Sequence, residues 1–147
     1  MEVTVTAMTE EYIEESVDLF MNTFSKEPWY DVYEPRDQVV TYFRNFYKNN
    51  YFVGYVGIVD NKIAALSIGI AKPWINGMEY YIQEFCVDYT QQGKGIGSKF
   101  IQSIMEDIKN HDMNAIILNT DKGFPAEAFY RKNGFEKLKD LIILAKQ

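Results

Sequence analysis

The chain has 147 residues, 47% of them hydrophobic, and a formal net charge of -6 at pH 7, which suits one globular domain over residues 1–147 with a core of its own. The acidic balance argues against nucleic acid as a partner, because proteins that bind phosphate backbones normally present a basic face. A single cysteine excludes an internal disulfide, and with only one histidine beside it we predict no metal site.

The sequence shows no sign of membrane insertion or secretion. No apolar run is long enough to span a bilayer, and residues 1–8 lack the basic start and apolar middle of a signal peptide. We therefore expect a cytoplasmic protein with no membrane partner.

The N-terminal half predicts a strand followed by two helices. Alternating valines and threonines predict the strand over residues 2–7. Apolar residues at helical spacing predict one helix over residues 9–25 and a second that begins at Arg36. The segment 26–35 between them contains two prolines, which interrupt regular helix, so we expect a loop there.

Three antiparallel strands are expected next. Residues 51–59 and 63–70 are two apolar runs joined by Asp60 and Asn61, a good hairpin turn. A second turn over residues 72–77 leads into a strand that carries Tyr80.

The C-terminal half alternates helices and strands. Its clearest helix spans residues 96–108, where apolar residues recur every three or four positions. A short apolar strand over residues 115–118 and a helix over 126–132 follow. Residues 135–138 and 141–145 are predicted to close the sheet as two short strands.

A glycine-rich loop lies between the strand after Tyr80 and the helix over 96–108. Gly93, Gly95 and Gly97 can expose backbone N–H groups at the positive end of that helix, which makes a natural cradle for phosphate. Two common phosphate loops do not match. A nucleotide triphosphatase loop needs Lys before Ser or Thr, whereas Ser98 precedes the lysine here, and the dinucleotide fingerprint needs a glycine where Ser98 stands.

The loop resembles the pyrophosphate loop of the GNAT superfamily of N-acetyltransferases. Residues 92–97, QGKGIG, fit that superfamily's pattern, and residues 126–135, AEAFYRKNGF, resemble its fourth helix and closing turn. The resemblance is close over about the last seventy residues. It implies an α/β (α+β) fold with a mixed, mostly antiparallel sheet of about seven strands and four flanking helices, splayed at the strand before the glycine loop. It also implies acetyl-CoA as the cofactor.

The resemblance further implies which residues meet the coenzyme. The strand would offer main-chain contacts to the pantetheine arm and the loop would hold the pyrophosphate. The superfamily commonly has an asparagine where Gly123 stands, so we expect that contact to move to Asn119. The expected cofactor contacts are Phe85, Cys86, Val87, Gln92, Gly93, Lys94, Gly95, Ile96, Gly97, Asn119 and Tyr130.

Two residues are expected to carry the chemistry. Glu84 stands in an otherwise apolar run, where a carboxylate is unexpected unless it lines a cavity, and the superfamily often has its general base there. Strand alternation leaves open that Glu84 faces solvent. Tyr130 occupies the position that resembles the superfamily's general acid, and its alternative role is ring packing.

The acceptor is expected to be a small cationic amine. The EPW and KPW segments are similar to those of aminoglycoside 6'-acetyltransferases, which implies an aminoglycoside or polyamine, although core packing is an equal explanation for the aromatic residues. The expected substrate contacts are Trp29, Tyr30, Asp31, Tyr33, Glu34 and Glu79. Acetylation of proteins or peptides, and a noncatalytic domain that senses coenzyme A, remain alternatives. The short C-terminal strands suggest pairing between two copies of the chain.

Overall fold

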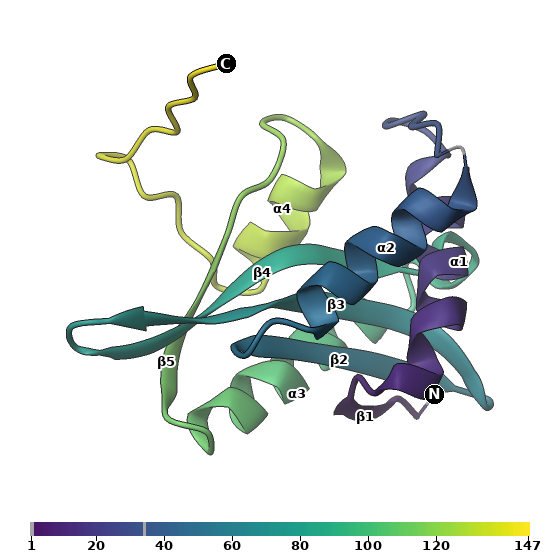
Figure 1. The fold of residues 1–147 in the computed structure, drawn as a ribbon, viewed down its shortest axis with the longest axis horizontal. Helices are drawn as coiled ribbons and strands as arrows, with labels where there is room; N and C mark the ends of the chain where they lie inside the picture. The colour runs from purple at the N-terminus through teal and green to yellow at the C-terminus, as the bar shows by residue number, and fades with distance from the viewer. Residues whose placement is uncertain (1, 34) are drawn as a thin grey trace.

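The computed structural model describes residues 2–33 and 35–147, and in these ranges the strands form one five-stranded sheet in the order β1-β2-β3-β4-β5 (Figure 1). The first four strands pair antiparallel, and β5 joins β4 in parallel. This confirms the expected mixed, mostly antiparallel sheet. The strands are β1 (Thr4–Ala7), β2 (Phe52–Val59), β3 (Lys62–Trp74), β4 (Gly77–Val87) and β5 (Met113–Leu118).

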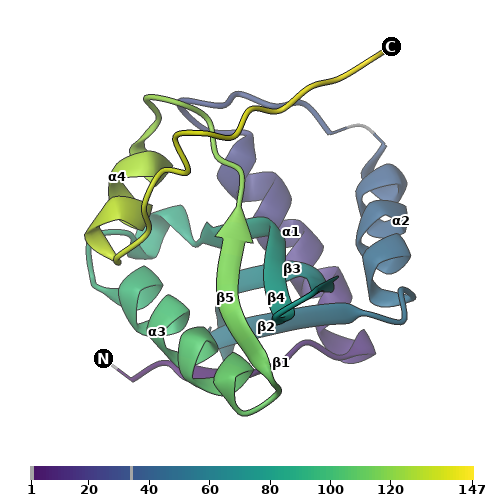
Figure 2. The same ribbon diagram turned by 90° about the vertical axis from the view of Figure 1, so that its left-hand side faces the viewer.

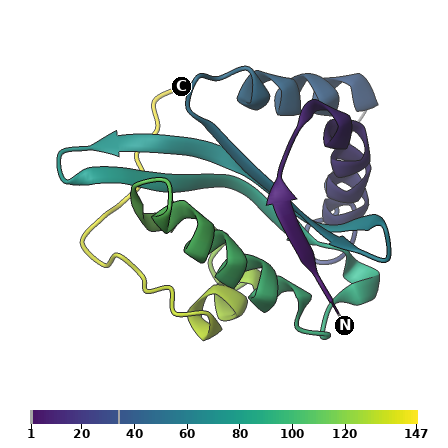
Figure 3. The same ribbon diagram turned by 90° about the horizontal axis from the view of Figure 1, so that it is seen from below.

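Helices cover both faces of this sheet. The α-helices in the described ranges are α1 (Ile13–Phe24), α2 (Arg36–Tyr47), α3 (Ile96–Lys109) and α4 (Pro125–Lys132), with short 3-10 turns at Glu10–Tyr12 and Tyr89–Gln91. Figure 3 shows α1 and α2 on one face and α3 and α4 on the other. None of the described helices combines the length and the apolar character that crossing a bilayer needs.

Each face of the sheet has its own apolar core. On the α1 and α2 side, the buried residues include Val17, Phe43 and Leu66. On the α3 side, Tyr80 and Phe100 are among the residues that are fully buried. The helical stripe predicted for residues 96–108 therefore faces the sheet, because burial of that stripe stabilises the helix.

The predicted strands over residues 135–138 and 141–145 are wrong. After α4 the chain continues as an irregular segment that leads away from the body (Figure 1), and the described sheet has five strands instead of about seven. The apolar run 141–144 is strongly exposed, with Ile142 79% and Leu144 83% accessible. Its residues favour strands, but a strand forms only where its backbone groups find a partner.

Candidate active site

A cavity of about 580 Å³ opens where β4 and β5 part. Their last paired residues are Ile82 and Leu118; beyond this point β4 runs on to Val87, while the chain after β5 turns toward α4. Figure 2 shows the two strands side by side with α4 beyond the end of β5. The sheet is therefore splayed at the strand before the glycine loop, as the resemblance implied. The parts of the chain that line the cavity are β4, the glycine loop, the end of β5 and the segment after it, α4 and the end of α1, together with Trp29 and with Ile143 of the C-terminal segment.

The glycine loop forms one wall of this cavity. Gly93 and Gly95 have φ angles of 84° and 80°, and a Cβ at either position would meet no atom within 4 Å. Gly95 is the N-cap of α3, so free N–H groups and the positive end of a 14-residue helix lie beside open space. The Gln92 side-chain amide donates to the Val87 carbonyl over 3.2 Å and ties the loop to β4. These features fit a pyrophosphate group.

Gly97 has a different role from the other two glycines. A Cβ at Gly97 would lie 2.8 Å from Cε1 of Phe129, so the first turn of α3 packs closely against α4. Gly97 and Ile96 are buried and line the cavity, whereas Lys94 is exposed and is not among the lining residues. Lys94 is thus the one expected loop contact that the described structure leaves outside the cavity.

A β-bulge in β4 decides where Glu84 points. Glu84 lies opposite Ile68 of β3, and Ile82 lies opposite the next residue, Gly69. Gln83 is therefore an extra residue with no opposite partner, and such an insertion shifts the alternation of every residue after it.

The bulge turns Glu84 toward α1 and α2. Before it, Tyr80 packs in the core on the α3 side; after it, Cys86 packs in the core on the α1 and α2 side. Both residues are even-numbered, so an unbroken strand would have put them on the same face. Glu84, two residues before Cys86, shares its face and lines the cavity half-buried.

Gly69 makes the bulge sterically feasible, which gives a test of stability. A Cβ at Gly69 would lie 1.9 Å from the carbonyl oxygen of Tyr81 in the neighbouring strand. We expect Gly69→Ala to lower the free energy of unfolding by about 3 kcal/mol, because the backbone of β4 at Tyr81 cannot easily move away from the added methyl group. Urea titration measures this change. Gly54→Ala is the control: its closest contact is the ring tip of Phe52, which can rotate away, so a loss of about 1 kcal/mol is expected. A loss of about 1 kcal/mol or less for Gly69→Ala would show that the bulge tolerates a methyl group.

The surroundings of Glu84 change the acidity of its carboxyl group. The hydroxyl of Tyr42 on α2 donates to Glu84 Oε2 over 2.6 Å. Burial raises the pKa of Glu84 above its ordinary value of 4.5, the Tyr42 hydrogen bond opposes that rise, and the charge of Asp31 adds to it. A carboxyl group with a raised pKa is a better base near neutral pH.

Tyr130 reaches the same cavity from α4. Its ring is 9% exposed and lies between those of Phe85, Phe129 and Phe135, at centroid distances of 5.9, 5.4 and 5.3 Å. Burial raises the pKa of Tyr130 beyond its ordinary range, so the hydroxyl keeps its proton in neutral and alkaline solution. Tyr130 and Glu84 thus offer a proton donor and a proton acceptor to one cavity.

The remaining expected cofactor contacts also line the cavity. They are Phe85, Cys86, Val87 and Asn119, and the side-chain amide of Asn119 donates to the Tyr81 hydroxyl over 2.7 Å. Cys86 is buried, and burial raises the pKa of its thiol, which makes it a poor nucleophile. In residues 2–33 and 35–147 no three His, Cys, Asp or Glu side chains come together as metal ligands.

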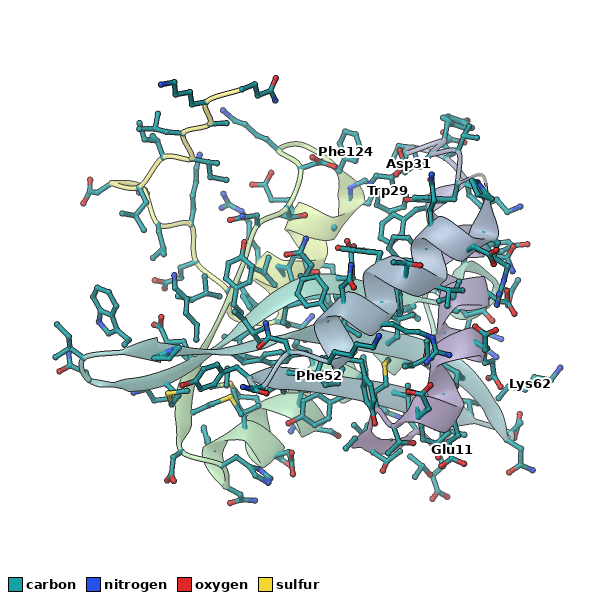
Figure 4. The ribbon with its side chains drawn as sticks, viewed as in Figure 1. Glu11, Trp29, Asp31, Phe52, Lys62 and Phe124 are labelled. Carbon is teal, nitrogen blue, oxygen red and sulfur yellow. The ribbon has the colours of Figure 1, made fainter. Side chains whose placement is uncertain are left out.

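The expected substrate residues do not all meet at the cavity. Trp29 lines it and faces Phe124 of the loop before α4, with ring centroids 6.1 Å apart (Figure 4). The Tyr33 hydroxyl donates to Asp31 over 2.9 Å, and neither residue lines the cavity. The other positions lie elsewhere: Tyr30 is 66% exposed, and Glu79 stands opposite Lys72 on the far part of β4. Glu34 lies outside the described residues.

Three functional candidates were not predicted from the sequence. Phe24 lines the cavity, the ring of Phe124 lies beside Trp29, and Tyr42 holds Glu84. Each stands among other aromatic residues, and no local pattern separates a tyrosine that bonds a carboxylate from one that only packs. Only the contact of α2 with the sheet identifies Tyr42.

Comparison with known proteins agrees with this geometry. Residues 6–135 match the Acetyltransferase (GNAT) family. No match was found among curated protein sequences. A family match over most of the chain, together with the splayed sheet and the glycine loop, defines the class: the chain belongs to the GNAT acetyltransferase family.

Several solved structures share the fold. One is an aminoglycoside acetyltransferase, meta-AAC0020, from an uncultured soil metagenomic sample, in complex with sisomicin; it has 16% identity and a TM-score of 0.77, with 99% of this chain and 95% of that chain covered. Another is AAC(6')-Iy in complex with a bisubstrate analogue of CoA and acetylneamine. It has 12% identity and a TM-score of 0.77, with 100% of this chain and 99% of that chain covered. A third is a transcriptional regulator from Bacillus halodurans C-125. It has 21% identity and a TM-score of 0.77, with 99% of this chain and 100% of that chain covered. At these identities the likeness concerns the fold.

Proposed function

We propose that this chain is an acetyl-CoA-dependent N-acetyltransferase that acetylates a primary amine of a small cationic molecule, of the aminoglycoside or polyamine type, by direct transfer in a ternary complex. The observation that carries the proposal is that Glu84 and Tyr130 line one cavity whose end is the open glycine loop. A domain that only senses coenzyme A would need neither group there.

Different residues of the cavity would carry out the different steps of amide formation. Acetyl-CoA, when bound, supplies an acetyl group activated as a thioester. The loop from Gln92 to Gly97 would hold the pyrophosphate and so fix the position of the thioester end. Glu84 would accept a proton from the attacking amine, and the Tyr130 hydroxyl would donate one to the departing sulfur. Cys86 takes no part, because its thiol is buried and stays protonated.

A cationic acceptor fits the charges near the opening. Two acidic residues, Glu84 and Asp121, and one basic residue, Lys132, line the cavity, and Asp31 adds a further negative charge that acts on Glu84. The indole of Trp29, which lines the cavity and lies beside the ring of Phe124, offers a face that attracts ammonium groups. Two fold neighbours are described with sisomicin and with a bisubstrate analogue of acetylneamine, which supports the choice of amine class to test first.

One experiment tests the proposal against its competitors. Calorimetry with coenzyme A tests the cofactor site, and release of free thiol from acetyl-CoA is then followed with aminoglycosides, polyamines and peptides. Turnover with aminoglycosides or polyamines supports the proposal. Turnover with peptides alone would assign the chain to protein or peptide acetylation, and binding without any turnover would favour the sensor.

We also propose that the protein forms a homodimer through its C-terminal segment. Residues 141–144 are exposed and apolar, the hairpin tip carries Trp74 and Ile75 at 60% and 91% exposure, and β5 has no strand on its outer edge in the described residues. Figure 2 views this side of the molecule, with β5 and the segment in front. Open strand edges and apolar patches favour pairing between chains.

The dimer has a direct test. We expect light scattering to give twice the chain mass of 17.2 kDa, and Ile142→Asp to give the single-chain mass, since a buried unpaired charge opposes association. Lys139→Asp, a charge change in the same exposed segment, is the control and is expected to stay dimeric. Wild-type protein of single-chain mass at micromolar concentration would reject the dimer.

A further inference from the structure

We propose that Tyr42 is a positioning residue that fixes the Glu84 carboxylate in the orientation needed at the cavity, an inference that rests on the proposed function. Tyr42 does not line the cavity itself. It stands behind the carboxylate, on α2, and is joined to it by the hydrogen bond of 2.6 Å from its hydroxyl to Oε2. Any effect of Tyr42 on the reaction therefore passes through Glu84.

The bulge in β4 and the position of α2 create this contact together. The bulge turns Glu84 toward the helical layer of α1 and α2, away from the face that Tyr80 and Ile82 share. A carboxylate that enters such an apolar layer needs a hydrogen-bond donor. Tyr42 is the donor that α2 supplies.

The ring of Tyr42 is held firmly, so its hydroxyl occupies a fixed point. It makes edge contacts with Phe43 and Phe46 at centroid distances of 6.0 and 5.5 Å, and it lies 6.4 Å from Phe20 of α1. Burial and the bond to Glu84 both raise the pKa of Tyr42, so the hydroxyl remains a donor at every pH of interest.

The hydrogen bond gives the two carboxylate oxygens of Glu84 different roles. Oε2 accepts a hydrogen bond from the Tyr42 hydroxyl, and Oε1 remains to accept a proton from the amine or from a water that relays it. A carboxylate free to rotate would spend less time in the orientation that suits proton transfer. The bond also favours the ionised form of Glu84, which is the form that acts as a base.

Several other ionisable groups lie near Glu84, and of these Asp31 acts on its pKa. Asp31 and Tyr33 come from the segment between α1 and α2, Cys86 lies on β4, and Tyr130 lies on α4. Asp31 acts against ionisation of Glu84 through its negative charge. Tyr42 is the group whose hydrogen bond favours the ionised carboxylate.

Tyr42→Phe tests the proposal, because it removes the hydroxyl and keeps the ring that packs on Phe46. With an amine that the wild type acetylates, kcat is expected to fall about tenfold while KM for acetyl-CoA changes less than about twofold. The acidic limb of kcat/KM is expected to move up by about one pH unit, since a bond to the charged form has been lost. Tyr47→Phe, which removes a hydroxyl from the same helix away from the cavity, is the matched control and is expected to match the wild type.

A second measurement does not depend on turnover. The carboxyl carbon of Glu84, labelled with ¹³C, is titrated by NMR in wild type and in Tyr42→Phe, and the midpoint is expected to rise by about one pH unit in the variant. An unchanged midpoint would overturn the role of Tyr42 even if the enzyme is active. A raised midpoint in a protein that acetylates no amine would reject the proposed function while the contact itself stands. A raised midpoint with unchanged kcat would overturn the positioning role.

Discussion

Glu84→Gln is expected to lower kcat about 100-fold or more, the usual effect of removing a general base. Glutamine keeps the size of the side chain and an oxygen that can accept the Tyr42 hydrogen bond, but it cannot take a proton from the amine. KM for acetyl-CoA is expected to change little, because the loop from Gln92 to Gly97 and not Glu84 forms the expected pyrophosphate site. Thiol release at saturating amine, measured for wild type and variant, gives the ratio.

The pH profile adds a second readout for the same variant. Because the pKa of Glu84 is raised by burial, the wild-type rate should fall on the acidic side at a pH above 4.5, where the carboxyl group becomes protonated. That limb is expected to disappear in Glu84→Gln. Glu106→Gln, an exposed change on α3, is the control. A Glu84→Gln variant with wild-type kcat would remove Glu84 from the mechanism.

A measurement of thermal stability distinguishes a variant that has lost catalysis from one that has lost its fold. A carboxyl group whose pKa is raised in the folded state favours folding below its unfolded pKa, and this contribution is lost as pH rises through the folded pKa. At neutral pH the ionised Glu84 therefore costs folding free energy. We expect the Tm of Glu84→Gln at pH 7 to equal or exceed that of the wild type, so a low rate in this variant reports on chemistry.

Tyr130→Phe is expected to lower kcat by about 100-fold while the dissociation constant for coenzyme A, measured by calorimetry, changes by less than about twofold. The phenyl ring preserves the packing against Phe85, Phe129 and Phe135, so the cavity keeps its shape. What is lost is the proton that the hydroxyl would donate to the departing sulfur. The raised pKa of Tyr130 also means that the wild type should lose no activity through ionisation of this group below pH 10.

Tyr51→Phe provides the comparison for Tyr130→Phe. Tyr51 is exposed and lies just before β2, so removal of its hydroxyl is expected to leave kcat and coenzyme affinity unchanged. If Tyr130→Phe lowered kcat and coenzyme affinity equally, or altered neither, Tyr130 would not be the proton donor.

The sequence by itself determined the features that depend on neighbouring residues. Helical spacing of apolar residues over 96–108 predicted α3, and the pair Asp60 and Asn61 predicted the β2–β3 hairpin, where both adopt positive φ angles. The glycine loop was also recognised from its own spacing. These features are encoded locally, because side-chain periodicity and the φ that a turn requires are properties of a few adjacent residues.

Only the tertiary structure decided which way Glu84 points and what holds it. The alternation of β4 is shifted by one residue at Gln83, which has no partner between Ile68 and Gly69 of β3. The partner of the carboxylate, Tyr42, comes from a helix 42 residues earlier in the chain. Strand pairing likewise determined the conformation of residues 141–145. Their strand propensity is high, but in the described structure no neighbouring strand accepts their hydrogen bonds. Strand phase, hydrogen-bond partners and sheet edges depend on contacts between distant segments, and a local pattern in one segment contains no information about the other.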